Sequence, residues 1–128
     1  MVKRKNWPMI TSLKENEIII VGTNKLGQHL GGAARQAYSD FGLKWGCGEG
    51  LSGQTYAFPT LDENFRQVSL NDLRRSRDRL YEVVESMPDK VFLLTSVGTG
   101  IAGFELEVIK ELFKDTPKNI KSWKHLKK

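Results

Sequence analysis

The sequence predicts an α/β fold in which helices cover a mixed, mostly parallel sheet. Three observations support this prediction: short apolar runs rich in β-branched residues, amphipathic stretches with helical spacing between them, and glycine or proline at their boundaries. Because strands and helices alternate along only 128 residues, we expect a single domain over residues 1–128.

The first predicted unit is a strand, a loop and a helix. Residues 17–21 (EIIIV) read as a buried strand, and residues 22–30 read as a loop. A helix is expected over residues 31–41, where apolar residues recur every four positions, and Gly42 is a plausible stop.

The next segment is predicted to be mostly irregular. Residues 43–53 contain four glycines in eleven positions, so we expect no regular structure there. Residues 55–58 (TYAF) read as a strand that Pro59 should end, and residues 60–68 as a loop.

The clearest helix is predicted over residues 69–87. Its apolar residues form a stripe at helical spacing, and the remaining positions are mostly charged. Ser69 followed by Asp72 approximates a capping box, and Pro88 marks the end.

The last unit repeats the pattern of strand, turn and helix. Residues 91–97 (VFLLTSV) read as a strand covered on both faces, and residues 98–103 (GTGIAG) as a glycine-rich turn. An amphipathic helix is expected over residues 104–114, and residues 119–123 could add a final short strand.

The net charge of +5 comes from the two ends of the chain. Eight basic residues and no acidic ones lie at the ends, about 1–6 and 117–128, whereas residues 7–116 contain 12 basic and 15 acidic residues. This distribution argues against a basic groove within the domain. It leaves open the alternative that the protein is nucleic-acid-associated and makes weak contacts with nucleic acid through its basic ends.

Composition also bears on the cellular compartment. The chain has no apolar run of membrane-spanning length and no apolar stretch after its first residues that would act as a signal peptide. Its lone cysteine, Cys47, excludes an internal disulfide and fits a reducing environment. We therefore expect a cytoplasmic protein without a membrane partner, and we expect no metal and no cofactor.

Glycines gather in two segments, with nine of the 12 between Gly22 and Gly53 and the other three in residues 98–103. A glycine-rich turn from a strand into a helix leaves unpaired backbone N–H groups that can bind an anion. The G-x-G-x-x-G spacing alone is a weak signal, and a tight connection without ligand is the alternative. No Lys-Ser or Lys-Thr follows, which argues against a P-loop triphosphatase.

The first crossover contains more polar groups. Asn24 follows the predicted strand and could hydrogen-bond a sugar hydroxyl, while Gly31 and Gly32 could form a second anion cradle. Two such strand ends facing one crevice are the usual nucleotide site of an open α/β sheet. His29 is the one histidine near either loop, and it is either a ligand or catalytic residue or a solvated or structural one.

Three ordered segments resemble the macrodomain family, which binds ADP-ribose. They are IIIVGTNKLGQHLGGAA, GEGLSGQTYAFPT and TSVGTGIAGF, and their closest likeness is to small, largely uncharacterised bacterial and phage macro-like proteins. The resemblance covers about residues 15–123. It implies a three-layer α/β/α sandwich that binds ADP-ribose or a related NAD-derived nucleotide.

The resemblance also implies which residues bind the ligand. Asn24 and the helix start at residues 31–33 would lie near the distal ribose, the second glycine-rich loop would wrap the diphosphate, and a third group would line the middle of the cleft. These ligand-binding residues are, in full, Gly22, Asn24, Gly31, Gly32, Ala33, Gly53, Gln54, Tyr56, Gly98, Thr99, Gly100, Ile101, Ala102 and Gly103. No counterpart of the family's adenine-binding acid is evident, so base specificity stays open.

Whether the protein turns over its ligand is also open. As an ADP-ribosyl glycohydrolase-type hydrolase it would remove ADP-ribose from a modified macromolecule, with Asn24 positioning ribose and water, and His29 or Glu49 moving the proton. As a reader or sequestering protein it would only bind. GTGIAG lacks the acidic residue that some hydrolytic relatives use, which favours binding. Three other candidates have simpler interpretations. The Glu49 carboxylate and the arginine cluster at residues 74–79 would be solvated, and Cys47 would have no functional role.

Overall fold

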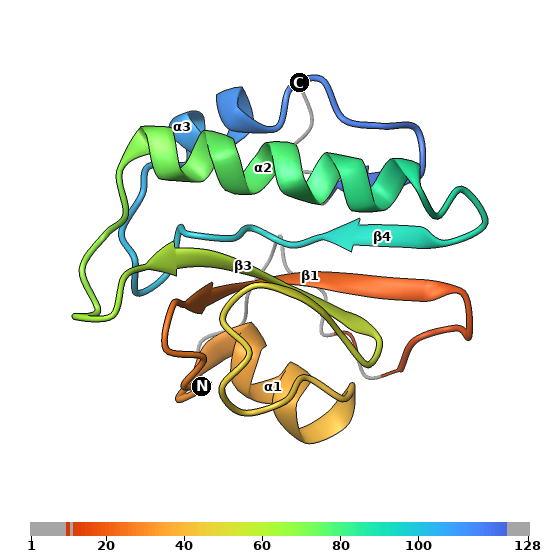
Figure 1. Cartoon of the computed structure of the whole chain (residues 1–128), viewed down its shortest axis with the longest axis horizontal. Coiled ribbons are helices and arrows are strands. Elements are labelled where there is room, and N and C mark those ends of the chain that lie inside the picture. The colour runs from red at the N-terminus through yellow and green to blue at the C-terminus, as the bar shows by residue number, and fades with distance from the viewer. Residues whose placement is uncertain (1–9, 11, 123–128) are drawn as a thin grey trace.

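The computed structural model describes residue 10 and residues 12–122 of the chain (Figure 1). Strands and helices alternate in the predicted order, with one additional short strand. In chain order the elements are β1 (Glu17–Asn24), α1 (Gly32–Asp40), β2 (Gly50–Ser52), β3 (Thr55–Leu61), α2 (Leu70–Glu85), β4 (Val91–Leu94), α3 (Leu106–Leu112) and β5 (Ile120–Ser122).

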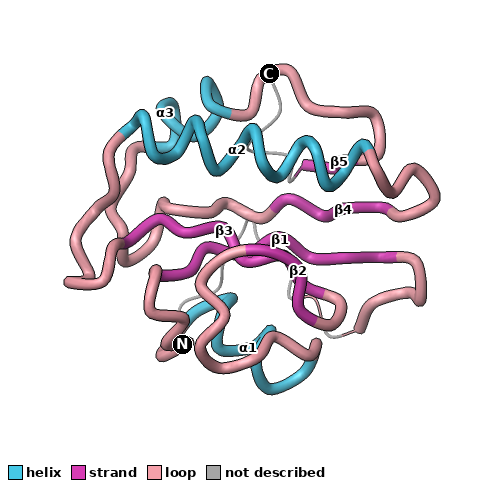
Figure 2. The backbone as a smooth tube through the Cα atoms, viewed as in Figure 1, coloured by secondary structure: helices cyan, strands magenta, loops and turns pink. Residues whose placement is uncertain are grey.

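The five strands form one sheet in the order β2-β3-β1-β4-β5 (Figure 2). β1 lies at the centre and pairs in parallel with β3 and β4, so that Ile20 is opposite both Tyr56 and Leu94. β5 continues the parallel part of the sheet, and β2 pairs antiparallel with β3 at the other edge. The sheet is therefore mixed and mostly parallel, as predicted.

Helices cover both faces of this sheet: α1 lies on one face, and α2 and α3 lie on the other (Figure 1). Successive side chains of β1 alternate between the two cores. Ile18 and Ile20 pack with the residues of α2 and α3, whereas Ile19 and Val21 pack with those of α1. The predicted three-layer α/β/α sandwich is confirmed.

The α2 helix confirms the predicted cap and apolar stripe. The Ser69 hydroxyl oxygen accepts a hydrogen bond from the Asp72 backbone N–H at 3.1 Å. Leu73, Leu80 and Val84 are fully buried against the sheet. The helix ends at Glu85, three residues before the proline that the sequence marked as its stop.

The prediction that Pro59 ends its strand is wrong, because β3 continues through it to Leu61. The short strand β2 pairs only with residues 55–57, so β3 has no strand neighbour at Pro59 on that side. A residue without a backbone N–H costs no ladder hydrogen bond there. The segment 43–53, expected to be wholly irregular, also contributes β2.

The ends of two strands and the start of the last helix also differ from the predictions. β1 extends three residues further, to Asn24, whereas β4 ends at Leu94 and not at Val97. α3 begins only at Leu106, so Phe104 and Glu105 separate it from the glycine-rich turn.

Backbone packs directly against backbone where residues 44–48 meet the loop after β1. The Gly46 N–H donates to the Gly27 carbonyl at 2.9 Å, and a side chain on Gly27 would lie 2.3 Å from the Gly46 carbonyl carbon. A side chain on Gly48 would lie 2.6 Å from the Lys25 carbonyl oxygen. These two glycines are required for chain packing, independently of any ligand.

The C-terminal basic segment is only partly separate from the domain. Lys121 belongs to β5, which pairs with β4, so the segment 117–128 contributes a strand to the sheet. The basic residues of the predicted N-terminal end and those after residue 122 lie outside the described residues. Across residue 10 and residues 12–122, no helix has both the length and the apolar character needed to cross a membrane.

Candidate functional site

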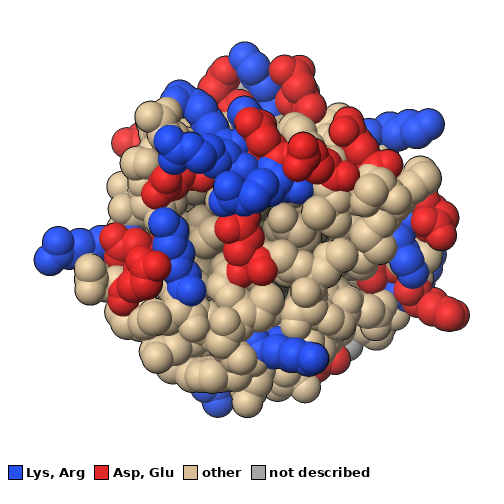
Figure 3. Space-filling view, viewed as in Figure 1, with Lys and Arg blue, Asp and Glu red and all other residues tan. Residues whose placement is uncertain are grey.

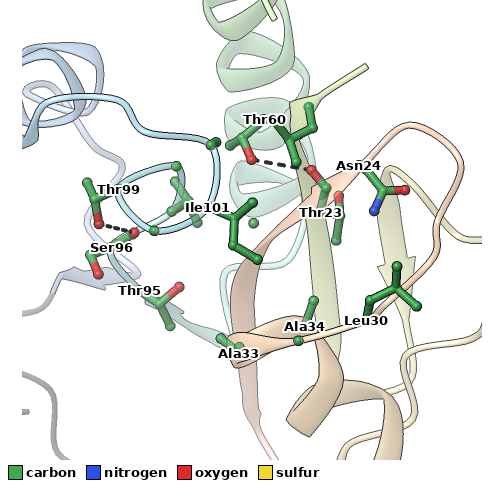
Figure 4. Close-up of a pocket in the computed structure, with 18 of the residues that line it drawn as sticks. Thr23, Asn24, Leu30, Ala33, Ala34, Thr60, Thr95, Ser96, Thr99 and Ile101 are labelled. Carbon is green, nitrogen blue, oxygen red and sulfur yellow. Dashed lines mark hydrogen bonds between the residues drawn. The ribbon is translucent and has the colours of Figure 1, made fainter. Parts of the chain in front are cut away.

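A pocket of about 760 Å³ opens at the carboxyl ends of the three central strands (Figure 4). The end of β1 and the start of α1 form one wall, and the segment after β4 forms the opposite wall. Residues from the end of β3 and the loop that follows it complete the lining. This volume is within the usual range for small-molecule sites.

The position of the pocket follows from the connectivity. After β1 the chain turns to the face covered by α1, and after β3 and β4 it turns to the face covered by α2 and α3. Connections that leave neighbouring strands toward opposite faces open a crevice between them. The pocket lies at this crevice, where the sequence placed the two glycine-rich loops.

The wall after β4 is built from consecutive turns. The Thr99 hydroxyl donates to the Ser96 carbonyl at 2.9 Å, and the Gly103 N–H donates to the Gly100 carbonyl at 3.0 Å (Figure 4). The Phe104 N–H closes the segment onto the Gly98 carbonyl at 2.8 Å. Five other backbone N–H groups of this wall have no acceptor among the described residues: those of Ser96, Gly98, Gly100, Ile101 and Ala102.

The start of α1 supplies a second set of backbone donors. No side chain caps this helix at Gly31. Within the described part of the chain, no acceptor meets the N–H groups of Gly31, Gly32, Ala33 and Ala34. All four residues line the pocket, at the positive end of the helix dipole.

The pocket wall is polar but uncharged. No Asp, Glu, Lys, Arg or His among the described residues lines it. The hydroxyls of Thr23, Thr60 and Thr95 are engaged within the protein, since they donate to the carbonyls of Gly48, Thr23 and Ile20 respectively. The half-buried Ser96 hydroxyl makes no hydrogen bond with a described residue and remains available to a ligand.

Asn24 lines the pocket, as predicted, but its amide is engaged in the loop. Its Nδ2 donates to the Gln28 carbonyl at 2.7 Å, and the Gln28 N–H donates to its Oδ1 at 3.0 Å. The side chain is 8% exposed. Its main observed contribution is to shape the loop between β1 and α1.

His29, a candidate catalytic residue, lies outside the pocket lining and is 1% exposed. Its Nε2 is 2.8 Å from the Lys44 carbonyl oxygen, so Nε2 carries the proton and donates it. The rings of Tyr38 and Trp45 pack at 6.1 and 5.9 Å from its own. The imidazole is thus part of the packing beneath α1, because its neighbours enclose it.

Glu49, the second candidate for proton transfer, is also absent from the pocket lining. Its carboxylate accepts two hydrogen bonds from the Arg79 guanidinium, at 2.7 and 3.0 Å. Burial, and secondarily the nearby Glu49 carboxylate, raise the pKa of Tyr56 to about 12. The structure therefore places Glu49 in a surface ion pair with α2.

The residues expected to line the middle of the cleft lie elsewhere. Gly53 packs against the backbone of Phe41 and Gly42, and Gln54 donates to the carbonyls of Lys14 and Glu17 at the opposite end of β1. Tyr56 is buried in the core with α2. They are displaced because β3 runs parallel to β1, so its first residues lie far from the carboxyl edge.

The predicted ligand-binding residues therefore divide into two groups. The structure brings together around the pocket Gly22, Asn24, Gly31, Gly32, Ala33, Gly98, Thr99, Gly100, Ile101 and Ala102. Outside the lining are Gly53, Gln54, Tyr56 and Gly103, together with His29 and Glu49.

Sequence reasoning missed the apolar side chains at the pocket. Leu30, Phe65 and Ile101 are 61%, 45% and 85% exposed, although each is large and apolar. They come from three different loops. Ile101 was expected only as a backbone donor, and an isolated apolar residue in a polar loop was the one available signal for Leu30 and Phe65.

The arginine cluster of α2 does not line the pocket. Arg75 and Arg77 form ion pairs with Asp72 and Asp78, at 2.9 and 3.1 Å. Basic and acidic side chains lie side by side over α2 in Figure 3, above a broad area with few charged residues. This arrangement agrees with a solvated helix face.

Comparisons with known proteins show the fold but no family. No family model and no curated protein matches the sequence. A solved structure of a protein of unknown function from Bacteroides thetaiotaomicron is similar, with a TM-score of 0.54 and 13% sequence identity. The alignment covers 91% of this chain and 90% of that one. At this identity the likeness concerns the fold alone.

Proposed function

We propose that the pocket binds ADP-ribose or a related NAD-derived nucleotide, and that the protein acts as a reader or sequestering protein for it. One observation carries the proposal. Nine backbone N–H groups from two loops, without acceptors among the described residues, belong to residues that line one uncharged pocket. A diphosphate requires a dense set of such donors when no basic side chain is present.

The remaining pocket features agree with a nucleotide of this kind. An extended ligand with two sugars and a diphosphate needs a pocket of several hundred Å³, and this one has about 760 Å³. The free Ser96 hydroxyl, which lines it, is a group that can hydrogen-bond a ribose.

Binding is better supported than hydrolysis. General acid–base catalysis needs a carboxylate, an imidazole or a similar group within reach of the reacting atoms. Within the described chain, neither a carboxylate nor an imidazole lines the pocket. We therefore expect no free ADP-ribose to appear when an ADP-ribosylated protein is incubated with this chain, and steady release would contradict the reader hypothesis.

The binding test uses two glycines that tolerate a side chain. A Cβ at Gly31 or Gly100 meets no atom within 4 Å, and neither residue has a positive φ. Gly31→Glu and Gly100→Glu should therefore fold normally but repel a diphosphate. Gly31→Gln is the matched neutral variant, which adds the same volume without the charge.

Isothermal titration with ADP-ribose and NAD distinguishes the outcomes. We expect measurable binding to the natural chain, a loss of at least about tenfold with either glutamate, and a smaller loss with glutamine. An unchanged affinity in both glutamate variants, or no binding of either nucleotide to the natural chain, would refute the proposal.

A further inference from the structure

Phe65 combines an unfavourable backbone conformation with a position in the pocket lining. Its φ is +59°, and it is the one non-glycine residue with a positive φ in the described part of the chain. A bulky side chain rarely adopts this conformation, where glycine would be free of strain. The residue is nevertheless 45% exposed, so burial compensates for the strain only in part.

Asp62 holds this conformation in place. Its Oδ1 accepts hydrogen bonds from the N–H groups of Asn64 and Arg66 at 2.8 and 3.0 Å. Its carbonyl accepts the Phe65 N–H at 3.0 Å, and its own N–H donates to the Arg66 carbonyl at 2.8 Å. Four hydrogen bonds thus close a five-residue loop around Phe65 and restrict the directions that its ring can take.

The loop is also connected to the opposite wall of the pocket. The Gln67 side-chain amide donates to the Ala102 carbonyl at 2.9 Å, beside the backbone donors after β4. Phe65, two residues before Gln67, is therefore held at a defined separation from those donors. The Phe65 ring is therefore held in a fixed position relative to the pocket, unlike a mobile surface side chain.

Phe65 also differs in chemistry from the rest of the pocket. It is the one aromatic residue among the described residues that line it, and Leu30 and Ile101 are the other large exposed apolar ones. In Figure 4, Ile101 extends from its loop toward the space in front of β1 and α1. The pocket thus joins a polar region rich in N–H donors to an apolar region with one flat surface.

We propose that Phe65 is a stacking platform for a flat conjugated ring of the pocket ligand, such as a nucleobase. The inference rests on the proposed function, since it assigns a second region of the same pocket. An exposed aromatic face stacks on any base, so affinity comes from the ring and selectivity among bases is weak. Backbone strain maintained at a binding site is common where the side chain has a direct role.

The test compares ligands with and without a base. All three ligands contain ribose: ADP-ribose carries a base and a diphosphate, adenosine carries a base without phosphate, and ribose 5-phosphate carries a phosphate without a base. We expect Phe65→Ala to weaken ADP-ribose and adenosine binding by about tenfold and to leave ribose 5-phosphate unchanged. Phe65→Trp should retain binding of all three, whereas Phe65→Leu, which keeps apolar area without a π face, should behave more like alanine.

A fourth variant separates binding from folding. Phe65→Gly relieves the positive φ, so it should unfold at the same or a higher temperature while base binding falls. If the unfolding temperature is unchanged or higher while the affinity falls, the loss of affinity is not caused by a damaged fold. Equal weakening of all three ligands in Phe65→Ala, or no weakening of any, would overturn the platform.

The same titrations keep this inference distinct from the proposed function. If the natural chain binds adenosine through Phe65 but neither ADP-ribose nor ribose 5-phosphate, the platform is supported and the nucleotide diphosphate proposal fails. If ADP-ribose binds and depends on Gly31 but not on Phe65, the proposal stands and the platform fails. If no ligand binds, both fail.

Discussion

The side-chain amide of Asn24 and the backbone of Gln28 form a closed pair of hydrogen bonds, 2.7 and 3.0 Å long, at the end of the central strand. The pair bridges four residues and defines the path of the chain from β1 toward α1. The backbone donors of residues 31–34 follow this loop directly, so their placement depends on it.

Replacing Asn24 with alanine should therefore destabilise the protein and weaken ligand binding together. Loss of the two buried hydrogen bonds should cost about 1–3 kcal/mol in the free energy of unfolding, measured by denaturant titration. Gln28→Ala is the matched control, because the pair uses only backbone atoms of Gln28. An Asn24→Ala variant as stable as the natural chain would contradict the role assigned to the pair.

Tyr81→Phe should stabilise the protein. The Tyr81 hydroxyl is buried and has no hydrogen-bond partner among the described residues, and a buried unsatisfied polar group costs about 1–3 kcal/mol. Removing it should raise the free energy of unfolding by about 1 kcal/mol. A clear decrease in thermal stability would indicate that the hydroxyl is satisfied after all.

The same tyrosine should contribute to a loss of stability at alkaline pH. Burial raises the pKa of Tyr81 to about 12, above the value near 10 that it has in the unfolded chain. The neutral phenol therefore favours the folded state fully below pH 10, and this contribution disappears as the pH rises to about 12. Between these values, stability should fall less steeply in Tyr81→Phe than in the natural chain.

Glu49→Gln tests whether the Glu49 carboxylate has any role at the pocket. The pair with Arg79 is partly exposed, at 32% and 51% for the two side chains, so its loss should cost less than about 1 kcal/mol. The pKa of Tyr56 should decrease because a nearby negative charge is removed, while burial still holds it above its usual value. ADP-ribose affinity should be unchanged, and a large decrease would place Glu49 at the ligand.

Salt dependence separates the proposed ligand from a nucleic acid. Because no charged side chain in the described chain lines the pocket, ADP-ribose affinity should change little between low and high salt. Nucleic-acid binding through the basic ends would instead fall steeply with salt and disappear when those ends are removed. The truncation should remove residues 1–6 and 123–128 only, because deletion from residue 117 would also remove β5.

Acidic pH should affect the pocket through Asp62. Hydrogen bonds from the Arg66 and Asn64 N–H groups hold the pKa of this carboxyl below its usual value near 4. Its contribution to the loop is therefore complete above pH 4 and is lost as the pH falls through the lower folded value. Adenosine affinity should fall in that range for the natural chain, whereas Asp62→Asn, which keeps an acceptor oxygen, should show a flatter profile.

Local patterns in the sequence predicted the layers of the fold well. The alternation of Ile18–Val21 between two cores and the capped helix after Ser69 both follow from periodicity and side-chain chemistry. The continuation of β3 through Pro59 could not be foreseen, because it depends on where β2 stops pairing. That end point is set by tertiary contacts and has no local signal.

For the candidate site, the sequence predicted the two donor-rich loops but not the third wall. Phe65 has a role only if its backbone is left-handed and its loop faces the pocket, and neither condition is visible in the letters DENFRQ. His29 is the opposite case, a residue that the sequence suggested as functional and that the structure places outside the pocket lining. Its position beside the glycines suggested chemistry, but burial under Tyr38 and Trp45 depends on a helix and a loop that close over it.

The close backbone packing at Gly27 and Gly48 means that some glycines of this chain are required for folding and others only for ligand binding. In a library randomised at these positions and sorted only for folded protein, Gly27 and Gly48 should survive, because any side chain there would meet backbone atoms. Gly31 and Gly100 should be replaced by many residue types in that library, since a side chain at either position meets only open space. They should return to glycine once the same library is sorted for nucleotide capture.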